Sequence, residues 1–423
     1  MKILVIGSGG REHAICDAFA RSPRINRLWC ANGNGGIAEV AECVPIKPDD
    51  VISLREFALE HKVDLSFVGG ETPLALGIVD EFEAAGLRII GPSRAAAQLE
   101  ASKSFAKDFM ARHGVPTASY VTTHSPSAAV DTLEAGQFGD ANAPVVVKAD
   151  GLAAGKGVVV AGDRSEAIAA INEMTDVVGA EAASTIVLEE CLFGREVSLL
   201  MFADGEDFQL MPPTRDHKRI GEGDTGPNTG GMGTFTDASL LSDDLISEIS
   251  NSIIRPTLSG CIAEGFPFRG ILFLGLMLTA EGPKVLEYNV RFGDPETQAI
   301  LVRLETDLVD ICEAMLGGRL SDLDIHWRPG SSACVVLAAE GYPSKPRNGD
   351  VISGLEDAAL LPSVKVFHAG TRLGDDGSLL TAGGRVLGVT AVAEDLQAAL
   401  STAYDAVERI SFEGMQFRRD IGR

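Results

Sequence analysis

The sequence LVIGSGGREHAI, residues 4 to 15, joins an apolar run to a glycine-rich turn and then to a helical pattern. An apolar run that enters such a turn predicts a strand buried on both faces and followed by a helix, the repeating unit of a parallel sheet. LSFVGG and LRIIG, further along, are similar runs with helical segments between them. We therefore expect a small doubly wound parallel sheet in the first part of the chain.

The glycine turn departs from the dinucleotide-binding fingerprint at two places. Gly7 and Gly9 take the first two glycine positions, but Glu12 takes the third, where its carboxylate would repel a pyrophosphate. Asn32 ends the next strand, where an acidic residue would hold a ribose. A helix N-terminus that favours an anion remains, with Arg11 beside it. The loop alone leaves two alternatives, a phosphate-bearing substrate or a tight turn without ligand.

The overall charge argues against two classes of partner. The 423 residues include 36 Lys and Arg against 60 Asp and Glu, a net charge of −24, so nucleic acid and anionic membranes would be repelled. The seven cysteines contain no CxxC pair and are typical of reduced thiols. Neither a leader pattern nor an apolar run of membrane-spanning length is present. We expect a cytoplasmic protein with no nucleic-acid or membrane partner.

A second glycine-rich stretch, VVVKADGLAAGKGVVV, lies between two predicted strands. It is not a P-loop, because Gly151 and Gly155-Lys156 are too close together and Gly157 replaces Ser or Thr. Such a loop can fold over a triphosphate. Lys148 interrupts a strand that otherwise looks buried, and a buried lysine needs a partner. A plain mobile hairpin is the alternative.

Consecutive carboxylates end the next apolar strand, in IVLEECLFGREVS. The backbone from Glu189 through Glu190 to Leu192 is placed to read an adenine edge, and Glu196 to accept hydrogen bonds from a ribose. A solvated turn remains the alternative for this stretch.

The stretch KVLEYNVRFGDPETQ carries a polar face. Residues two apart in a strand share a face, so Glu287, Asn289 and Arg291 should point together. Carboxylate and amide oxygens are ligands that magnesium takes alongside substrate phosphates, and an arginine clamps a carboxylate. A salt-bridged sheet edge would also alternate, but it rarely needs an asparagine. We interpret this face as a metal and substrate site.

A long polar loop, RDHKRIGEGDTGPNTGGMG, precedes that strand. A loop of this length is usually functional or disordered. Its composition predicts an active-site loop with Asp216 and Lys218 among the residues that bind substrate.

Six motifs together resemble the glycinamide ribonucleotide synthetase family of the ATP-grasp superfamily. They are GSGGREHA, GPSRAAAQLEASKSFAK, VVKADGLAAGKGV, RDHKRIGEGDTGPNTGGMG, EYNVRFGDPETQ and GGRVLGVTA. The resemblance implies a multidomain α/β and α+β protein. Its parts would be an N-terminal substrate-binding α/β domain with a doubly wound parallel sheet (1–103), ATP-grasp domains (104–325) with a mobile lid (121–194), and a small C-terminal α+β domain (326–423).

The resemblance also implies an activity. ATP would phosphorylate the carboxylate of glycine to glycyl phosphate, and the amine of 5-phosphoribosylamine would attack it. The products would be glycinamide ribonucleotide, ADP and phosphate, in de novo purine biosynthesis. The implied metal is Mg²⁺ or Mn²⁺, and we expect a monomer. Another ATP-grasp ligase or carboxylase, or a nucleotide-binding module without catalysis, are the alternatives.

Residue roles follow from the resemblance by motif. The residues implied for ATP are Lys103, Lys148, Gly151, Gly155, Lys156, Gly157, Glu189, Glu190, Leu192 and Glu196. Those implied for phosphoribosylamine or glycine are Gly9, Gly10, Arg11, Glu12, Gly70, Glu71, Asp216 and Arg291. Those implied for catalysis are Arg291, Asp216 and Lys218, and those for the metal are Glu287 and Asn289. Thr214-Arg215 departs from the Ser-Gln that commonly begins the family's polar loop.

Overall fold

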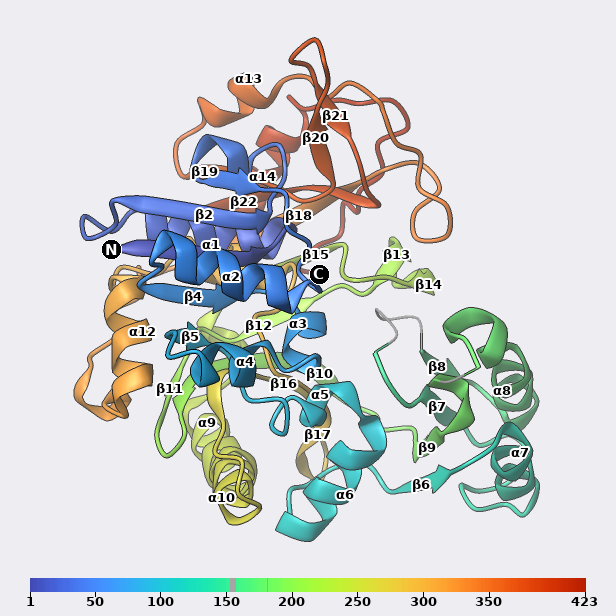
Figure 1. Ribbon diagram of the computed structural model, residues 1–423. Helices are drawn as coiled ribbons and strands as arrows, with labels where there is room; N and C mark the ends of the chain where they lie inside the picture. Colours follow the sequence, from blue (N-terminus) through green and yellow to red (C-terminus); the bar gives the residue numbers. More distant parts are fainter. Residues whose placement is uncertain (153–156, 181) are drawn as a thin grey trace.

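The computed structural model describes residues 1–152, 157–180 and 182–423 (Figure 1). The N-terminal part contains a parallel sheet with the strand order β3-β2-β1-β4-β5. Its elements are β1 (Lys2–Gly7), α1 (Gly10–Ala20), β2 (Arg27–Asn32), η1 (Ile37–Glu39), β3 (Glu42–Val44), α2 (Val51–His61), β4 (Leu65–Val68), α3 (Glu71–Ala75), α4 (Ile78–Ala84) and β5 (Ile89–Ile90). This confirms the expected doubly wound sheet.

The strand order of this sheet locates a binding crevice. The strand order reverses between the parallel neighbours β1 and β4, because β2 and β3 are added on one side of β1 and β4 and β5 on the other. Ligands of such sheets bind at the carboxyl ends of the strands at that point. The turn after β1 leads into Gly9–Glu12, and the turn after β4 leads into Gly70 and Glu71. The two predicted substrate segments, 60 residues apart along the chain, therefore meet at one edge.

The helical stretch that follows is divided. α5 (Gln98–Ala101) ends at Ser102, and α6 (Lys103–His113) begins there because the Ser102 hydroxyl accepts a hydrogen bond from the Phe105 amide at 3.1 Å. Gly114 ends α6 in the left-handed region, with φ of 65°. The break at Ser102 places Lys103 at a helix N-terminus.

A small four-stranded antiparallel sheet lies to one side of the molecule in Figure 1, with the strand order β6-β9-β7-β8. Its elements are β6 (Tyr120–Thr123), α7 (Pro126–Glu134), β7 (Val145–Ala149), β8 (Val158–Ala161), α8 (Arg164–Val178), η2 (Ala182–Ser184) and β9 (Ile186–Glu190). α7 and α8 pack on it around a separate apolar core that includes Leu133, Val147 and Ile171. We call this unit the lid sheet.

The largest sheet in the described part of the chain has the strand order β17-β16-β10-β12-β15-β18-β22-β19, with β11 beside β10. Its strands are β10 (Arg195–Asp204), β11 (Phe208–Leu210), β12 (Thr214–Asp216), β15 (Gly233–Thr236), β16 (Arg269–Thr279), β17 (Gly282–Asn289), β18 (Ser331–Ala338), β19 (Val364–His368) and β22 (Arg385–Ala393). The pairing of β15 with β18 carries this sheet into the C-terminal part. Antiparallel hairpins join β10 to β11 after Asp204-Gly205 and β16 to β17 at Glu281-Gly282.

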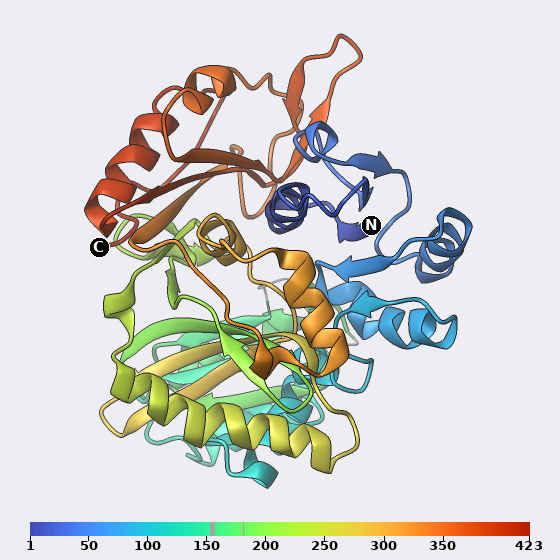
Figure 2. The same ribbon diagram turned by 90° about the vertical axis from the view of Figure 1, so that its left-hand side faces the viewer.

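Helices cover this sheet, and two small hairpins extend from it. The remaining elements are β13 (Arg219–Gly221), β14 (Thr225–Asn228), η3 (Ala238–Leu240), α9 (Asp243–Ile249), η4 (Ser250–Ile254), α10 (Arg255–Ala263), α11 (Glu296–Leu301), α12 (Leu308–Gly317), η5 (Leu320–Asp322), α13 (Leu355–Ala359), β20 (Thr371–Leu373), β21 (Leu379–Thr381) and α14 (Leu396–Val407). In Figure 2 the yellow helices α9 and α10 lie across the lower half of the sheet, and the red α14 packs on the C-terminal strands. None of the described helices combines the length and apolar character needed to cross a bilayer.

Candidate active site

The predicted metal-binding face lies on β17. Glu287 stands opposite Gly275 of β16, and Asn289 stands opposite Phe273. A β-bulge at Leu286 shifts the register just before Glu287. Gly275 leaves room for the carboxylate, since a Cβ there would lie 3.2 Å from Cγ of Glu287. The bulge and this glycine together set where the Glu287 side chain points.

Cations from distant parts of the chain surround Glu287. Burial opposes its ionisation, but the nearby positive charges hold the pKa of Glu287 below its ordinary value. These charges are Lys218, Lys148, Lys103 and Arg291. The carboxylate is therefore ionised at neutral pH, and four residues predicted separately from sequence meet around it.

The oxygen atoms on this face suit a divalent cation. The Asn289 Oδ1 accepts a hydrogen bond from Nη2 of Arg291 at 3.1 Å, which fixes the amide orientation. One ionised carboxylate and one amide oxygen are hard ligands, and magnesium usually combines one or two such ligands with substrate phosphates and water. Glu287 and Asn289 therefore fit the implied metal.

Lys103 and Lys148 reach this centre from two different elements. Lys103 begins α6, its Nζ donates to the Gly151 carbonyl at 2.8 Å, and burial lowers its pKa. Lys148 lies on β7 with 6 % exposure, and its Nζ lies 2.8 Å from Oε1 of Glu189. The expectation that this buried lysine needs a charged partner is confirmed.

Asp150 is a residue that sequence reasoning missed. Its Oδ1 accepts hydrogen bonds from the amides of Lys103 at 2.6 Å and Ser104 at 3.3 Å, so it caps α6 from the lid sheet. The carboxylate follows Lys148 by two residues in a strand-ending position, which was the available signal.

The glycine loop beyond Asp150 is described only at its ends. Gly151 adopts φ of +108°, a conformation that favours glycine. The carbonyl of Gly157 accepts a hydrogen bond from the Ala149 amide at 2.8 Å and closes the hairpin. The predicted ATP-binding residues Gly155 and Lys156 lie outside the described residues.

The predicted adenine-binding stretch ends β9. Glu189 is 2 % exposed and turned into the protein, whereas the Glu190 carboxylate accepts a hydrogen bond from the Ser119 amide at 2.9 Å. Leu192 follows the strand. Glu196 is the second residue of β10, and its Oε2 lies 3.0 Å from Nζ of Lys218. The Glu189 side chain is thus a structural ion-pair partner, and the backbone remains the part that could read a base.

The polar loop brings Asp216 and Lys218 to the same centre. Asp216 ends β12, and burial raises its pKa although Lys218 opposes the shift. The pKa of Lys218 is raised by Asp216 and Glu196 together. The hairpin β13–β14 is held by Arg418, whose Nη1 lies 2.7 Å from Asp224 Oδ1, a contact that no sequence motif indicated.

The two charged residues of the N-terminal turn, Arg11 and Glu12, make different contacts. The Arg11 Nη1 donates to the Gly69 carbonyl at 2.6 Å and lies 3.9 Å from Glu71 Oε2. Glu12 is 4 % exposed, its Oε2 accepts a hydrogen bond from the Gly9 amide at 2.6 Å, and a Cβ at Gly69 would lie 2.2 Å from its Oε1. Glu12 therefore stabilises the turn, while Arg11 remains beside the crevice.

Two further predicted positions, Gly10 and Gly70, begin helices at this crevice. Gly10 is the first residue of α1, and Gly70 precedes α3 in an extended conformation. A Cβ at Gly10 would lie 2.5 Å from Nε2 of Gln298, so α1 and the GDPETQ segment are in close contact.

Arg291 joins the N-terminal crevice to the metal face. Its Nε lies 3.1 Å from Glu71 Oε2, and its Nη2 lies 2.7 Å from Glu100 Oε1. Burial opposes ionisation of Glu71, but Arg291 and Arg11 lower its pKa to about 2. Glu100 of α5 was missed, because its neighbours in sequence suggest only an ordinary helix.

The GDPETQ segment adds acidic groups that sequence reasoning did not assign. Asp294 Oδ2 lies 3.1 Å from Nη2 of Arg385, in the GGRVLGVTA motif, and its Oδ1 accepts a hydrogen bond from Gln298 at 2.7 Å. Burial and the neighbouring Asp216 raise the pKa of Glu296 to about 7. Asp294 and Arg385 are 91 residues apart along the chain, so Arg385 holds the two motifs against each other.

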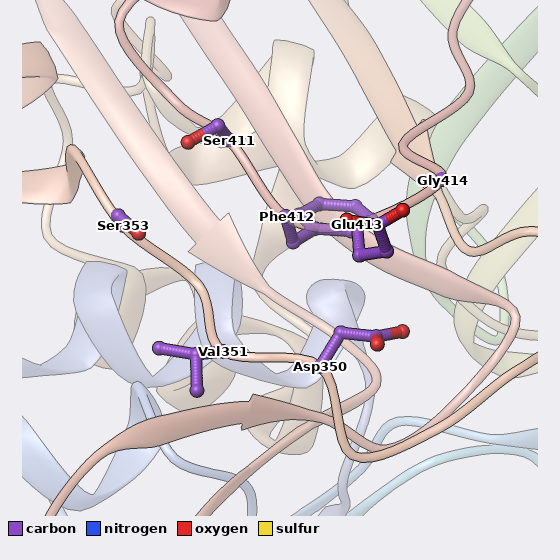
Figure 3. Close-up of a pocket in the computed structure, with 7 residues that line it drawn as sticks. All are labelled: Asp350, Val351, Ser353, Ser411, Phe412, Glu413 and Gly414. Atoms are coloured by element: carbon purple, nitrogen blue, oxygen red, sulfur yellow. The ribbon is translucent and has the colours of Figure 1, made fainter.

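A surface cavity of about 460 Å³ lies elsewhere, in the C-terminal part. Figure 3 shows Asp350, Val351 and Ser353 on one loop and residues 411–414 on the facing loop. The cavity shares no lining residue with the predicted site, and nothing assigns it to the reaction.

Comparison with known families covers most of the chain. The N domain of phosphoribosylglycinamide synthetase matches residues 1–100, its ATP-grasp (A) domain matches residues 101–297, and its C domain matches residues 332–423. A phosphoribosylamine–glycine ligase of Xanthomonas axonopodis pv. citri is 48 % identical over all of this chain and 97 % of its own length. One from Caldanaerobacter subterraneus is 44 % identical over all of this chain and 99 % of its own.

Solved structures agree with these matches. The phosphoribosylamine–glycine ligase of Thermotoga maritima aligns over the whole of both chains with 34 % identity and a TM-score of 0.86. The biotin carboxylase domain of Hydrogenobacter thermophilus 2-oxoglutarate carboxylase, in complex with MgADP, covers 98 % of this chain and 91 % of its own. At 16 % identity and a TM-score of 0.74 it shares the fold alone. The chain belongs to the phosphoribosylglycinamide synthetase family.

Proposed function

We propose that this chain joins glycine to 5-phosphoribosylamine at the expense of ATP, through glycyl phosphate, and so makes glycinamide ribonucleotide, ADP and phosphate for purine biosynthesis. The relatives named phosphoribosylamine–glycine ligase, which cover the whole chain, support the overall reaction. The single observation that carries the mechanism is the gathering of Lys103, Lys148 and Lys218 around Glu287. That arrangement is what phosphoryl transfer from a nucleotide requires.

The first half-reaction needs positioning and charge neutralisation rather than an enzyme nucleophile. Lys103 and Lys148 would neutralise the ATP phosphates, and the loop 151–157 would close over them. Glu287 and Asn289 would hold the magnesium ion, and that ion would supply positive charge against the phosphate charge that develops during transfer. Arg291 would orient the carboxylate of glycine, because a guanidinium binds a carboxylate in a bidentate geometry.

The second half-reaction would use the N-terminal crevice. Arg11, with the turns at Gly9–Gly10 and Gly70–Glu71, would hold 5-phosphoribosylamine so that its amine faces the activated glycine. Asp216 and Lys218 would contact substrate from the polar loop. Arg291 contacts Glu71 on one side and Asn289 on the other, so the two half-sites are directly adjacent.

Several finer features belong to the same proposal. We infer a division into residues 1–103, 104–325 and 326–423, with a lid at about 121–194 in keeping with the separate core of the lid sheet. The metal would be Mg²⁺ or Mn²⁺, and we infer that the protein is a cytoplasmic monomer.

An ADP-release assay with single omissions tests this function. Rapid ADP release should require glycine and 5-phosphoribosylamine together, and it should stop when either substrate is left out. Release of ADP with bicarbonate in place of glycine would contradict the proposal and favour a carboxylase that shares the fold.

Replacing Arg11 by Ala should raise the KM for 5-phosphoribosylamine by about tenfold, the loss expected for one charge-assisted hydrogen bond. The KM for ATP should change by much less, because Arg11 lies in the N-terminal crevice. Steady-state kinetics with each substrate varied in turn measure both constants. Arg24→Ala is the matched control, since Arg24 pairs with Asp310 and Glu313 at the surface. Equal increases in both constants would contradict the assignment.

A further inference from the structure

A buried ion cluster beside the site contains a lysine that the mechanism above does not use. Lys107 lies on α6 one turn after Lys103, and its side chain is 3 % exposed. Its Nζ lies 2.8 Å from Oε2 of Glu189, and Nζ of Lys148 lies 2.8 Å from the other oxygen, Oε1. We refer to these three residues as the lysine–glutamate triad.

The triad is fixed by hydrogen bonds to the strand that carries the metal ligands. Lys107 Nζ donates to the Thr117 hydroxyl at 2.8 Å, which donates to the Val285 carbonyl at 2.7 Å. Lys148 Nζ donates to the Leu286 carbonyl at 3.1 Å. The cluster thus ties α6 and the lid sheet to the bulged part of β17.

The charges of the triad do not cancel. Two ammonium groups share one carboxylate, so the net charge is +1. Burial lowers the pKa of Lys107 to about 8, while Glu189 opposes the shift and Lys148 adds to it, so Lys107 is mostly charged at neutral pH. Without Lys107, the negative charge of Glu189 would be balanced by Lys148 alone, and the pair would be neutral overall.

The positive charge of the triad acts electrostatically on the groups at the proposed reaction centre. The charge of Lys148 lowers the pKa of Glu287 and also that of Lys103. These groups are buried, where salt screens interactions less than at the surface. Any change in the charge balance of the triad should therefore reach the place where ATP phosphates would bind.

We propose that Lys107 is a positioning residue for ATP, which occupies one oxygen of Glu189 so that this carboxylate does not cancel the positive charge that Lys148 presents to the nucleotide phosphates. This inference rests on the proposed function, in which Lys148 contacts ATP. Lys107 itself touches no substrate in this scheme. Its effect is transmitted through the shared carboxylate.

The test compares Lys107→Met with the double variant Lys107→Met/Glu189→Gln. The single variant has a neutral triad, whereas the double variant restores a net charge of +1 on Lys148. Loss of Lys107 should weaken MgATP binding about tenfold, a typical loss for one buried charge interaction. The double variant should return to within about threefold of the unaltered protein, because it regains the charge.

Calorimetric titration with MgATP in the absence of glycine measures this binding without turnover. KM for ATP should follow the binding constant, while kcat should change little. Lys365→Met is the matched control, because Lys365 lies on β19, far along the chain from the triad, and pairs with Asp17 on α1. It should bind MgATP as the unaltered protein does.

The outcomes separate a charge effect from a packing effect. Unchanged MgATP binding in Lys107→Met, or a double variant that binds more weakly than the single one, would overturn the inference. If Lys107→Met does not fold, MgATP binding by the double variant Lys107→Met/Glu189→Gln is the deciding measurement. Weak binding of MgATP by the folded double variant would contradict the inference. Failure of the omission assay with normal MgATP titrations would instead overturn the proposed reaction.

Discussion

Replacing Glu287 by Gln is expected to lower turnover by about a hundredfold or more at fixed magnesium, because a metal that neutralises phosphate charge contributes several kcal/mol to such reactions. The substitution removes one negative charge and keeps the shape, so the contact with Gly275 is retained. Asn289→Ala should act in the same direction, since it removes the second oxygen ligand. Turnover is measured by ADP release with ATP, glycine and 5-phosphoribosylamine all at saturation.

Magnesium titration distinguishes loss of a ligand from loss of packing. Both variants should require more magnesium for half-maximal activity, and excess metal should restore part of the rate. Glu281→Gln is the control, because Glu281 lies in the turn before the same strand and pairs with Lys284 at the surface. Normal turnover in both Glu287→Gln and Asn289→Ala would show that the metal does not bind at this face.

The sequence predicted those parts of the structure that depend on local pattern. The period of two in a strand placed Glu287 and Asn289 on one face, and the glycine turn after β1 predicted the parallel sheet. A lysine in an apolar strand predicted that Lys148 has a charged partner. Each of these conclusions needs only neighbouring residues.

What the sequence did not reveal depends on contacts between distant segments. Lys107 and Glu189 are 82 residues apart, and Arg291 and Glu100 are 191 apart, so no local spacing indicates either pair. The resemblance implies Glu12 for substrate binding, but no motif indicated that its carboxylate also fills the space left by Gly9 and Gly69. Such roles follow from packing, which a period or a motif does not encode.

Arg291→Met should have two separable effects, on stability and on turnover. Removing the guanidinium leaves Glu100 buried without its cation, and breaking one partner of a buried pair typically costs about 3–5 kcal/mol of stability. Turnover should fall by about 10²–10³-fold, the loss typical when an enzyme loses one hydrogen-bond donor that stabilises charge in the transition state. Denaturant unfolding and ADP release measure the two effects separately.

The double variant Arg291→Met/Glu100→Gln tells these effects apart. Glutamine keeps an oxygen for the Val290 amide, which donates to Glu100 at 2.8 Å, but carries no charge, so most of the stability should return. Burial already raises the pKa of Glu100 with Arg291 present. In the single variant the pKa should rise further, so its stability deficit should be larger at pH 8 than at pH 5. Turnover should stay low in both variants. Recovery of turnover together with stability would mean that Arg291 supports the fold and does not handle glycine.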